Sequence, residues 1–251
     1  MDRFSQLEFG SVHPEEPGKP GEPIRDAHYF HQEAQKYWLA GDFEVALRNY
    51  SRTLEQDSSF FAGWSGQLRM LLELDENKEA DLWADKAMGL FPDHPELLAL
   101  KAVANKRDNK LRQAMAYSDN AVGKEDLTPR VWLARAEVFL ERKHAVVDGC
   151  LSKAVILATG DKPIIKLEAG RLLRRKKSYA QAMTYLNEAL QSLPESALAW
   201  YELGCCQSRM GLNQAYHSLQ EALRIHPHWD KASEALQGFQ GRGFWGRLFK
   251  R

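Results

Sequence analysis

Cysteine is scarce in this sequence, and its spacing does not fit a metal site. Cys205 and Cys206 are adjacent and Cys150 stands alone, so the odd count fits a reducing compartment rather than a disulfide framework. Because cysteine is among the most often buried residue types, we expect all three in the core or lining a groove. No apolar run approaches the roughly 20 residues that span a bilayer, and no signal segment opens the chain. These absences predict a cytoplasmic protein that is at most peripheral at a membrane.

The sequence also lacks an excess of charge of either sign and any recognisable catalytic motif. Lys plus Arg and Asp plus Glu both number 34, so the net charge gives no reason to expect nucleic-acid binding. There is no glycine-rich phosphate loop, no paired-carboxylate motif and no nucleophilic serine flanked by glycines. The pairs His28/His31 and His226/His228 have no third ligand at a fixed spacing. We therefore expect no enzyme activity, no cofactor and no metal.

What the sequence does contain is a unit of about 34 residues, clearest in residues 61–94. Six anchors open the first helix of each unit, separated by 34, 34, 34, 33 and 35 residues: Phe30, Trp64, Leu98, Trp132, Ile165 and Trp200. Mostly small residues follow four positions later: Ala34, Leu68, Ala102, Ala136, Ala169 and Gly204. The second helix contributes its own row: Ala46, Ala80, Ala114, Val147, Ala182 and Ala215. Independent rows thus predict six helix-turn-helix units.

This pattern resembles the tetratricopeptide repeat (TPR). A large residue stands in the first helix, alanines recur in the second, and a proline closes three units, at Pro92, Pro194 and Pro227. The best local match is Trp200, Tyr201, Leu203 and Gly204. The resemblance implies an all-α, right-handed superhelical solenoid with a capping helix, whose stacked first helices line a concave face.

With this register the chain divides into four parts. A flexible leader rich in proline and glycine covers residues 1–26. Six repeats cover residues 27–60, 61–94, 95–128, 129–161, 162–196 and 197–229. A capping helix takes residues 230–240, and three glycines then loosen the chain before an aromatic and basic tail, residues 241–251.

The inner positions of the first helices mix basic and apolar side chains. We expect the partner-binding groove to include Arg69, Arg107, Leu133, Lys166, Arg174, Tyr201 and Arg209. The cations should be exposed there and give charge-assisted hydrogen bonds. Family members that grip chaperone C-termini use a clamp of Lys, Asn and Arg, but the corresponding positions here are His31, Gln35, Gly66, Glu96 and Leu100, so that clamp is not expected.

Two basic segments have alternative interpretations. Seven basic residues lie in residues 162–177, which fits either a solvated helix end or a patch for an acidic peptide or phosphate. The tail residues Phe244, Trp245, Arg247, Leu248, Phe249 and Lys250 have the amphipathic pattern of an interfacial helix. They predict docking on an anionic membrane or in a partner's groove.

The favoured function is a non-catalytic adaptor that holds a segment of a partner protein in its concave groove. One alternative is a peripheral membrane-associated assembly factor anchored by the tail. A weaker alternative is a regulatory subunit of an enzyme complex.

Overall fold

The computed structural model describes residues 25–141 and 144–248, with the backbone alone for residue 144 and for residues 241–248. In these ranges the chain forms thirteen α-helices and no strand. They are α1 Ala27–Ala40, α2 Phe43–Gln56, α3 Phe61–Glu73, α4 Asn77–Leu90, α5 Pro95–Arg107, α6 Leu111–Val122, α7 Pro129–Val138, α8 His144–Leu157, α9 Lys162–Arg175, α10 Tyr179–Leu190, α11 Ala197–Arg209, α12 Gln214–Ile225 and α13 Asp230–Leu248. The predicted all-α solenoid of about six hairpins and a terminal helix is confirmed.

Local sequence signals set the limits of these helices. The Asp26 side chain accepts a hydrogen bond from the Tyr29 amide at 2.9 Å and so caps the start of α1. Pro95, Pro129 and Pro163 lie in the first turns of α5, α7 and α9, where a missing N–H has no cost. Consecutive helices pack as antiparallel hairpins around the residues of the two predicted rows, all of which are buried.

In α9, the first helix of the fifth repeat, the anchor position lies one residue later than the sequence suggests. Leu97, Val131, Ile165 and Ala199 are each 0% exposed and lie 34 residues apart. Ile165 therefore belongs to the column before the anchors, and the anchor of this unit is Lys166. The anchors from Trp64 to Trp200 then follow a uniform 34-residue spacing, and the predicted steps of 33 and 35 are wrong.

The tryptophan anchors are not all buried, although equivalent core positions of the repeats would be. Trp64 is 3% exposed, whereas Trp132 and Trp200 are half-buried. Their rings face the second helix of their own hairpin, with Lys153 over Trp132 at 4.1 Å and His217 against Trp200 at 5.9 Å. The column is therefore partly on the outer side of the hairpins rather than between units.

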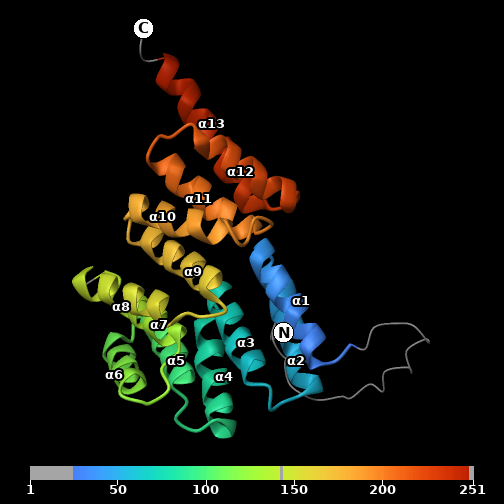
Figure 1. Cartoon of the computed structure of the whole chain (residues 1–251), viewed down its shortest axis with the longest axis vertical. Coiled ribbons are helices and arrows are strands. Elements are labelled where there is room, and N and C mark those ends of the chain that lie inside the picture. The colour runs from blue at the N-terminus through green and yellow to red at the C-terminus, as the bar shows by residue number, and fades with distance from the viewer. Residues whose placement is uncertain (1–24, 142–143, 249–251) are drawn as a thin grey trace, which may run out of the picture.

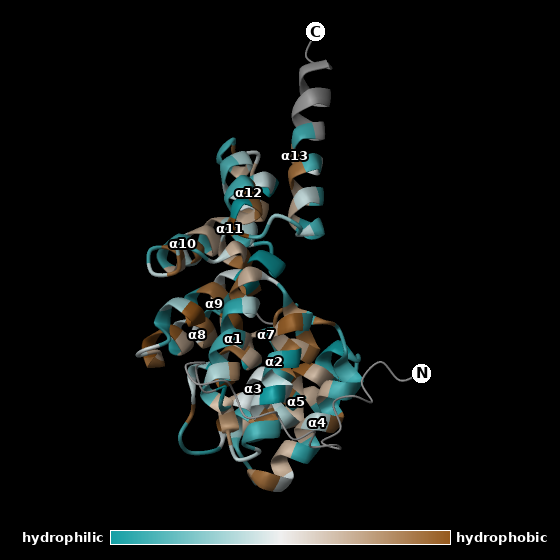
Figure 2. Cartoon of the chain, turned by 90° about the vertical axis from the view of Figure 1, so that its right-hand side faces the viewer, coloured by the Kyte–Doolittle hydropathy of each residue, from teal (hydrophilic) through white to brown (hydrophobic). Residues whose placement is uncertain are grey.

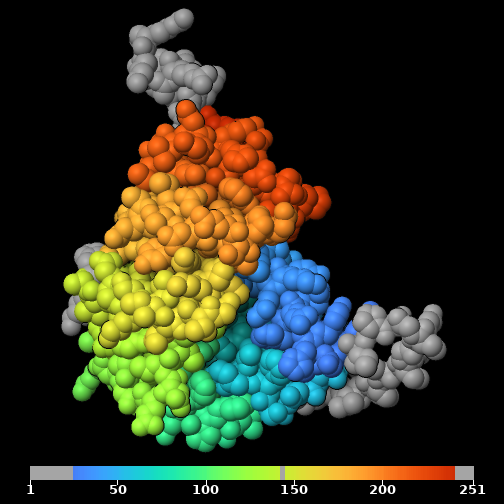
Figure 3. Space-filling model, viewed as in Figure 1, coloured from blue at the N-terminus to red at the C-terminus, as the bar shows by residue number. Residues whose placement is uncertain are grey.

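The stack curls until its first repeat touches its last, as Figures 1 and 3 show. We call this contact the seam: the turn at residues 39–43 packs against Ser196, His226 and Trp229, and Tyr201 packs on the ring of Trp229. The Ser196 hydroxyl donates to the Leu39 carbonyl at 3.0 Å, and His226 Nδ1 lies 3.0 Å from the Ala40 carbonyl oxygen. The two ends of the array are therefore held together.

A glycine makes the seam close-packed. Gly41 ends α1 with φ of +83°, and a Cβ added to it would lie 2.4 Å from the Trp229 ring. Only glycine meets both requirements without strain. Trp229 is 7% exposed, with the rings of Tyr201 and His226 against it at 4.8 and 5.7 Å.

The terminal helix is longer than predicted. Instead of ending near residue 240, α13 continues through the glycines at positions 241 and 243 to Leu248, and it projects past the last hairpin. Figure 2 shows the first part of α13 from the side, standing next to α12. The side chains of Phe244, Trp245, Arg247 and Leu248 lie outside the described residues, as do Phe249, Lys250 and residues 1–24 of the leader. No described helix is long and apolar enough to cross a membrane.

Candidate partner-binding pocket

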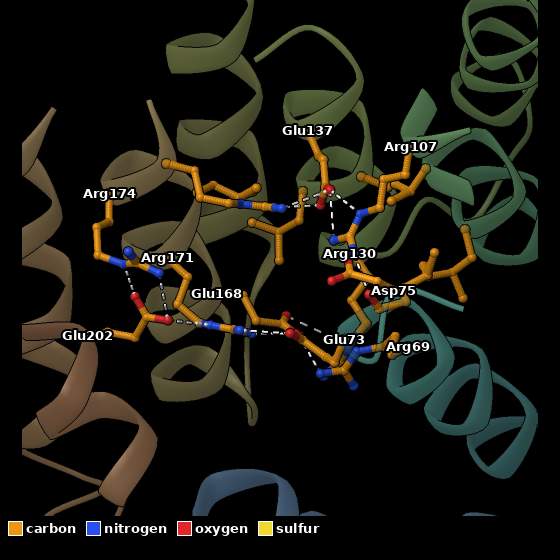
Figure 4. A pocket seen from close by; sticks show the side chains of 17 residues that line it. Arg69, Glu73, Asp75, Arg107, Arg130, Glu137, Glu168, Arg171, Arg174 and Glu202 are labelled. Atoms are coloured by element: carbon orange, nitrogen blue, oxygen red, sulfur yellow. Dashed lines mark hydrogen bonds and ion pairs between the residues drawn. The ribbon is translucent and has the colours of Figure 1, made fainter. Parts of the chain in front are cut away.

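A pocket of about 230 Å³ lies on the inner side of the curled stack. Its walls come from the first helices α3, α5, α7, α9 and α11, and its apolar lining consists of Leu72, Leu100, Val103, Leu133, Ala134 and Leu172. Six arginines and five acidic residues provide the rest: Arg69, Arg107, Arg130, Arg171, Arg174 and Arg175, with Glu73, Asp75, Glu137, Glu168 and Glu202. Figure 4 shows these side chains pointing toward one another across the pocket.

The 34-residue spacing explains why these residues meet. Leu100, Ala134, Glu168 and Glu202 form one column of equivalent positions, and Val103, Glu137 and Arg171 form a second. Glu73, Arg107 and Arg175 belong to a third, which also contains Glu141 and Arg209. Because equivalent positions of stacked repeats point the same way, acids and bases in these columns are brought together.

Glu137 is held between two guanidinium groups. Arg107 Nε donates to Glu137 Oε1 at 2.8 Å, while Arg175 Nη1 and Nη2 contact the two carboxylate oxygens at 3.0 and 2.7 Å. Burial alone would raise the pKa of Glu137, but Arg175 and Arg107 outweigh it and hold that pKa well below its usual range. The carboxylate stays ionised, and this triad carries one net positive charge.

Arg171 is the centre of a second group. Its Nη1 and Nη2 contact Glu73 Oε1 and Oε2 at 2.5 and 2.8 Å, and its Nε donates to Glu202 Oε1 at 3.1 Å. Glu202, whose side chain is 2% exposed, also accepts from Arg174. Burial would lower the pKa of Arg171, but the carboxylates of Glu73 and Glu202 outweigh it and raise the pKa above its usual value.

A third group joins the second repeat to the fifth. Arg69 donates to Glu168, a residue 99 positions away, and its guanidinium lies 4.9 Å from the Trp38 ring centre. Arg130 Nε lies 4.0 Å from Glu168 Oε2, and its Nη1 lies 3.0 Å from Asp161. The inner face is thus crossed by ion pairs rather than lined by free cations.

The seven predicted groove residues divide into two sets. Arg69, Arg107, Leu133 and Arg174 do line the pocket, but the three arginines are paired and partly buried rather than exposed. Lys166, Tyr201 and Arg209 do not line it. Lys166 pairs with Glu188 of α10 at 2.6 Å, Tyr201 packs in the seam, and Arg209 is exposed at the end of α11.

The misplacement of Lys166 has a simple cause. One residue on an α-helix corresponds to a rotation of about 100°. Taking Ile165 as the anchor of α9 instead of Lys166 therefore assigns Lys166 to the inner face and leaves Arg171 off it. The uniform 34-residue column through Glu137 would have found Arg171. The basic run at residues 162–177 is mostly a set of ion pairs, since Arg171, Arg174, Arg175 and Lys176 also contact acids.

The described residues contain no group of three or more His, Cys, Asp or Glu side chains that could hold a metal ion. The burial of the cysteines follows the sequence prediction in part: Cys150 and Cys206 are buried, and Cys205 is half-buried. Burial raises the pKa of Cys205 to about 11 and that of Cys206 to about 12, which keeps both thiols protonated.

The family model for the tetratricopeptide repeat matches residues 31–95 and 161–207. No curated protein matches the sequence. Among solved structures, a TPR protein from Parabacteroides merdae has a TM-score of 0.53 and 14% identity, covering 88% of this chain and 87% of that one. A chain of the APC/C hetero-tetramer Cut9-Hcn1 has a TM-score of 0.55 and 17% identity, covering 86% of this chain. Human IFIT1 in complex with PPP-AAAA has a TM-score of 0.55 and 17% identity, covering 88% of this chain. The chain spans 43% of the Cut9-Hcn1 chain and 57% of IFIT1.

Proposed function

Because the chain belongs to the tetratricopeptide repeat family, whose members are generally scaffolds for protein–protein interaction, we propose that it is a non-catalytic adaptor that holds a partner's segment in the inner pocket. The observation that carries this proposal is the convergence of five first helices on one pocket with an apolar lining and charged walls. Apolar lining with a few oriented polar groups is the usual composition of a binding site. The pocket is large enough for a side chain or two of a partner.

Filling the pocket tests this function. Ala134 lines it and is 8% exposed, so Ala134→Trp should occupy the space that a partner needs. Ala180→Trp, at an exposed position of α10, is the matched control. Affinity purification with the full chain, followed by mass spectrometry, should recover a partner with the wild type and the control but not with Ala134→Trp.

Both variants must first show wild-type helical content and a cooperative thermal transition. Equal recovery of the same partner by a folded Ala134→Trp variant would place the binding surface elsewhere.

A second candidate function is peripheral membrane attachment through the tail. It is supported by the continuation of α13 to Leu248 as one helix that projects past the last hairpin. A helical backbone would give Phe244, Trp245 and Leu248 the arrangement that interfacial helices use. After sedimentation with vesicles of anionic lipid, the wild-type chain should be found in the pellet with the vesicles. A chain lacking residues 242–251 should stay in the supernatant. Equal sedimentation of the two would reject this function.

A further inference from the structure

The bond between Arg171 and Glu73 crosses the pocket. It joins α9 to the last residue of α3, two positions 98 residues apart, through two parallel N–H to oxygen contacts of 2.5 and 2.8 Å. This fork is the geometry by which a guanidinium recognises a carboxylate from any source. The site therefore already has the shape of a carboxylate receptor.

Arg171 keeps its orientation through contacts that do not involve Glu73. Its Nε donates to the buried Glu202 carboxylate at 3.1 Å, and its guanidinium lies 5.9 Å from the centre of the Phe43 ring in the seam. These contacts come from α11 and from the first repeat. If Glu73 withdrew, the fork would still point into the pocket.

Glu73 is the partner that is easiest to remove. Its side chain is 21% exposed, against 14%, 10% and 2% for Glu168, Glu137 and Glu202. Among the described residues, Arg171 is its hydrogen-bond donor, through both Nη1 and Nη2. It also ends its helix, just before Asp75, whose φ of +61° marks a tight turn. A small change in this turn could draw the carboxylate back.

The surroundings of the fork favour an anion in place of Glu73. Arg107 and Arg175 both act on the Glu73 carboxylate electrostatically, and together with Glu137 they carry one net positive charge. Glu137 and Glu202 lie deeper in the pocket, where they cannot meet a ligand first, because their side chains are 10% and 2% exposed. The most exposed charged group of the lining is Asp75 at the rim, at 88%, and the arginines of the second and first groups that follow it are Arg174 and Arg175, at 31% and 38%.

We propose that Glu73 is an internal occupant of an oxyanion site on Arg171, and that the segment bound by the pocket carries an aspartate or glutamate side chain that replaces it. This inference rests on the proposed adaptor function and specifies its ligand as an acidic peptide. The exchange substitutes one carboxylate for another, so Arg171 keeps a partner throughout. In the free protein, Glu73 lowers the affinity of the pocket by competing for the same donors.

Removing the charge of Glu73 tests the proposal, because a competitor and a purely structural contact give opposite results. The probe is a fluorescently labelled hexaglutamate peptide, with hexaglutamine as the uncharged comparison, titrated with the full chain and followed by anisotropy. Glu73→Gln should bind hexaglutamate about tenfold more tightly than the wild type, the scale of one hydrogen bond to a charged group. The Arg171→Gln variant should bind hexaglutamate no more tightly than it binds hexaglutamine.

Glu141→Gln is the matched control. Glu141 occupies the same repeat position as Glu73, but its side chain is 77% exposed and it lies outside the pocket. It removes the same charge and should leave the affinity for hexaglutamate unchanged. Equal tightening by Glu141→Gln would show a general effect of net charge and overturn the proposal.

A second variant keeps the test independent of folding. Glu73→Asp retains the charge but shortens the side chain by one methylene, so it should hold Arg171 less well and also tighten peptide binding. Unchanged or weaker binding in both folded Glu73 variants would overturn the competitor role. A phosphoserine peptide that bound where hexaglutamate did not would also overturn the assignment to carboxylates.

The two proposals fail in different ways. If the wild type and Ala134→Trp recover the same partner, the adaptor function in this pocket is wrong. If Ala134→Trp loses the partner while Glu73→Gln leaves hexaglutamate binding unchanged, the pocket is correct and the role of Glu73 is wrong.

Discussion

The seam and the pocket both join repeats that are far apart in the chain, but they do so with different chemistry. The seam uses the Trp229 ring packed on Gly41 and two contacts to backbone carbonyls, at Leu39 and Ala40. The pocket uses ion pairs, such as Arg171 with Glu73 and Arg69 with Glu168. The seam depends on shape, while the pocket depends on charge.

This difference assigns them different tasks. A close-packed aromatic ring against a glycine has one arrangement, because any shift opens a void or a clash. A carboxylate on a guanidinium can be replaced by another carboxylate of similar geometry. We therefore infer that the seam fixes the curvature of the stack while the pocket contacts can exchange partners.

The largest expected effect comes from breaking the seam. Trp229→Ala removes a ring that is 7% exposed and should destabilise the protein by about 3–5 kcal/mol, as large aromatic core truncations do. Urea unfolding followed by circular dichroism measures the change. The same experiment on Trp132→Ala, at a half-buried outer position, should give a smaller loss.

A loss below about 1 kcal/mol for Trp229→Ala, or one equal to that of Trp132→Ala, would show that the seam adds little to stability. The contact between the first and last repeats would then be incidental to the fold.

The next effect comes from the pocket. Glu137→Gln leaves Arg107 and Arg175 without their shared carboxylate in a place where the Glu137 side chain is 10% exposed. Removing one member of a largely buried ion pair leaves uncompensated charge, and we expect a loss of about 2 kcal/mol because Arg175 is partly solvated. Urea unfolding at neutral pH should show it, and a stability equal to that of the wild type would mean that water replaces the carboxylate.

Acid should weaken the ion pairs of the pocket. The arginines hold the pKa values of Glu137 and Glu73 below the usual 4.5 even though burial opposes this. The unfolded chain therefore binds these protons at a higher pH than the folded chain. The stabilisation is complete above about pH 4.5 and is lost as the pH falls below it.

The measurement is the free energy of unfolding between about pH 6 and pH 2.5 for the wild type and Glu137→Gln. The wild type should lose more stability over this range, so that the two curves approach each other at low pH. Parallel curves would show that Glu137 does not contribute through its charge.

Sequence alone could predict much of this architecture and less of the site. The alanine rows and the large anchors predict the hairpins, because the side chains that pack within each repeat recur at equivalent positions about every 34 residues. The sequence places the anchor of α9 one residue too early, at Ile165 instead of Lys166, because Ile165 is the apolar residue of the two. That shift hid Arg171, which links the pocket to the seam.

The seam itself has no local signal in the sequence. From the sequence, Gly41 is an ordinary turn residue after the first helix, and Trp229 is the last residue of the sixth repeat. Their contact depends on the rotations that accumulate over six hairpins. The pairing of Arg171 with Glu73 depends on the same curvature, so neither contact could be derived from spacing within a single repeat.

The smallest expected effect is at Glu141, which shows whether position or charge alone matters. Glu141 stands at the repeat position of Glu73 and pairs with Lys106 at 3.1 Å, but its side chain is 77% exposed. Exposed ion pairs contribute little, so Glu141→Gln should change the unfolding free energy by less than about 0.5 kcal/mol. Urea unfolding of this variant beside Glu137→Gln compares the same chemical change at two levels of burial. Equal losses would mean that each ion pair contributes equally to stability wherever it lies. A loss confined to Glu137→Gln would show that an ion pair stabilises the fold only where it is buried, as in the pocket.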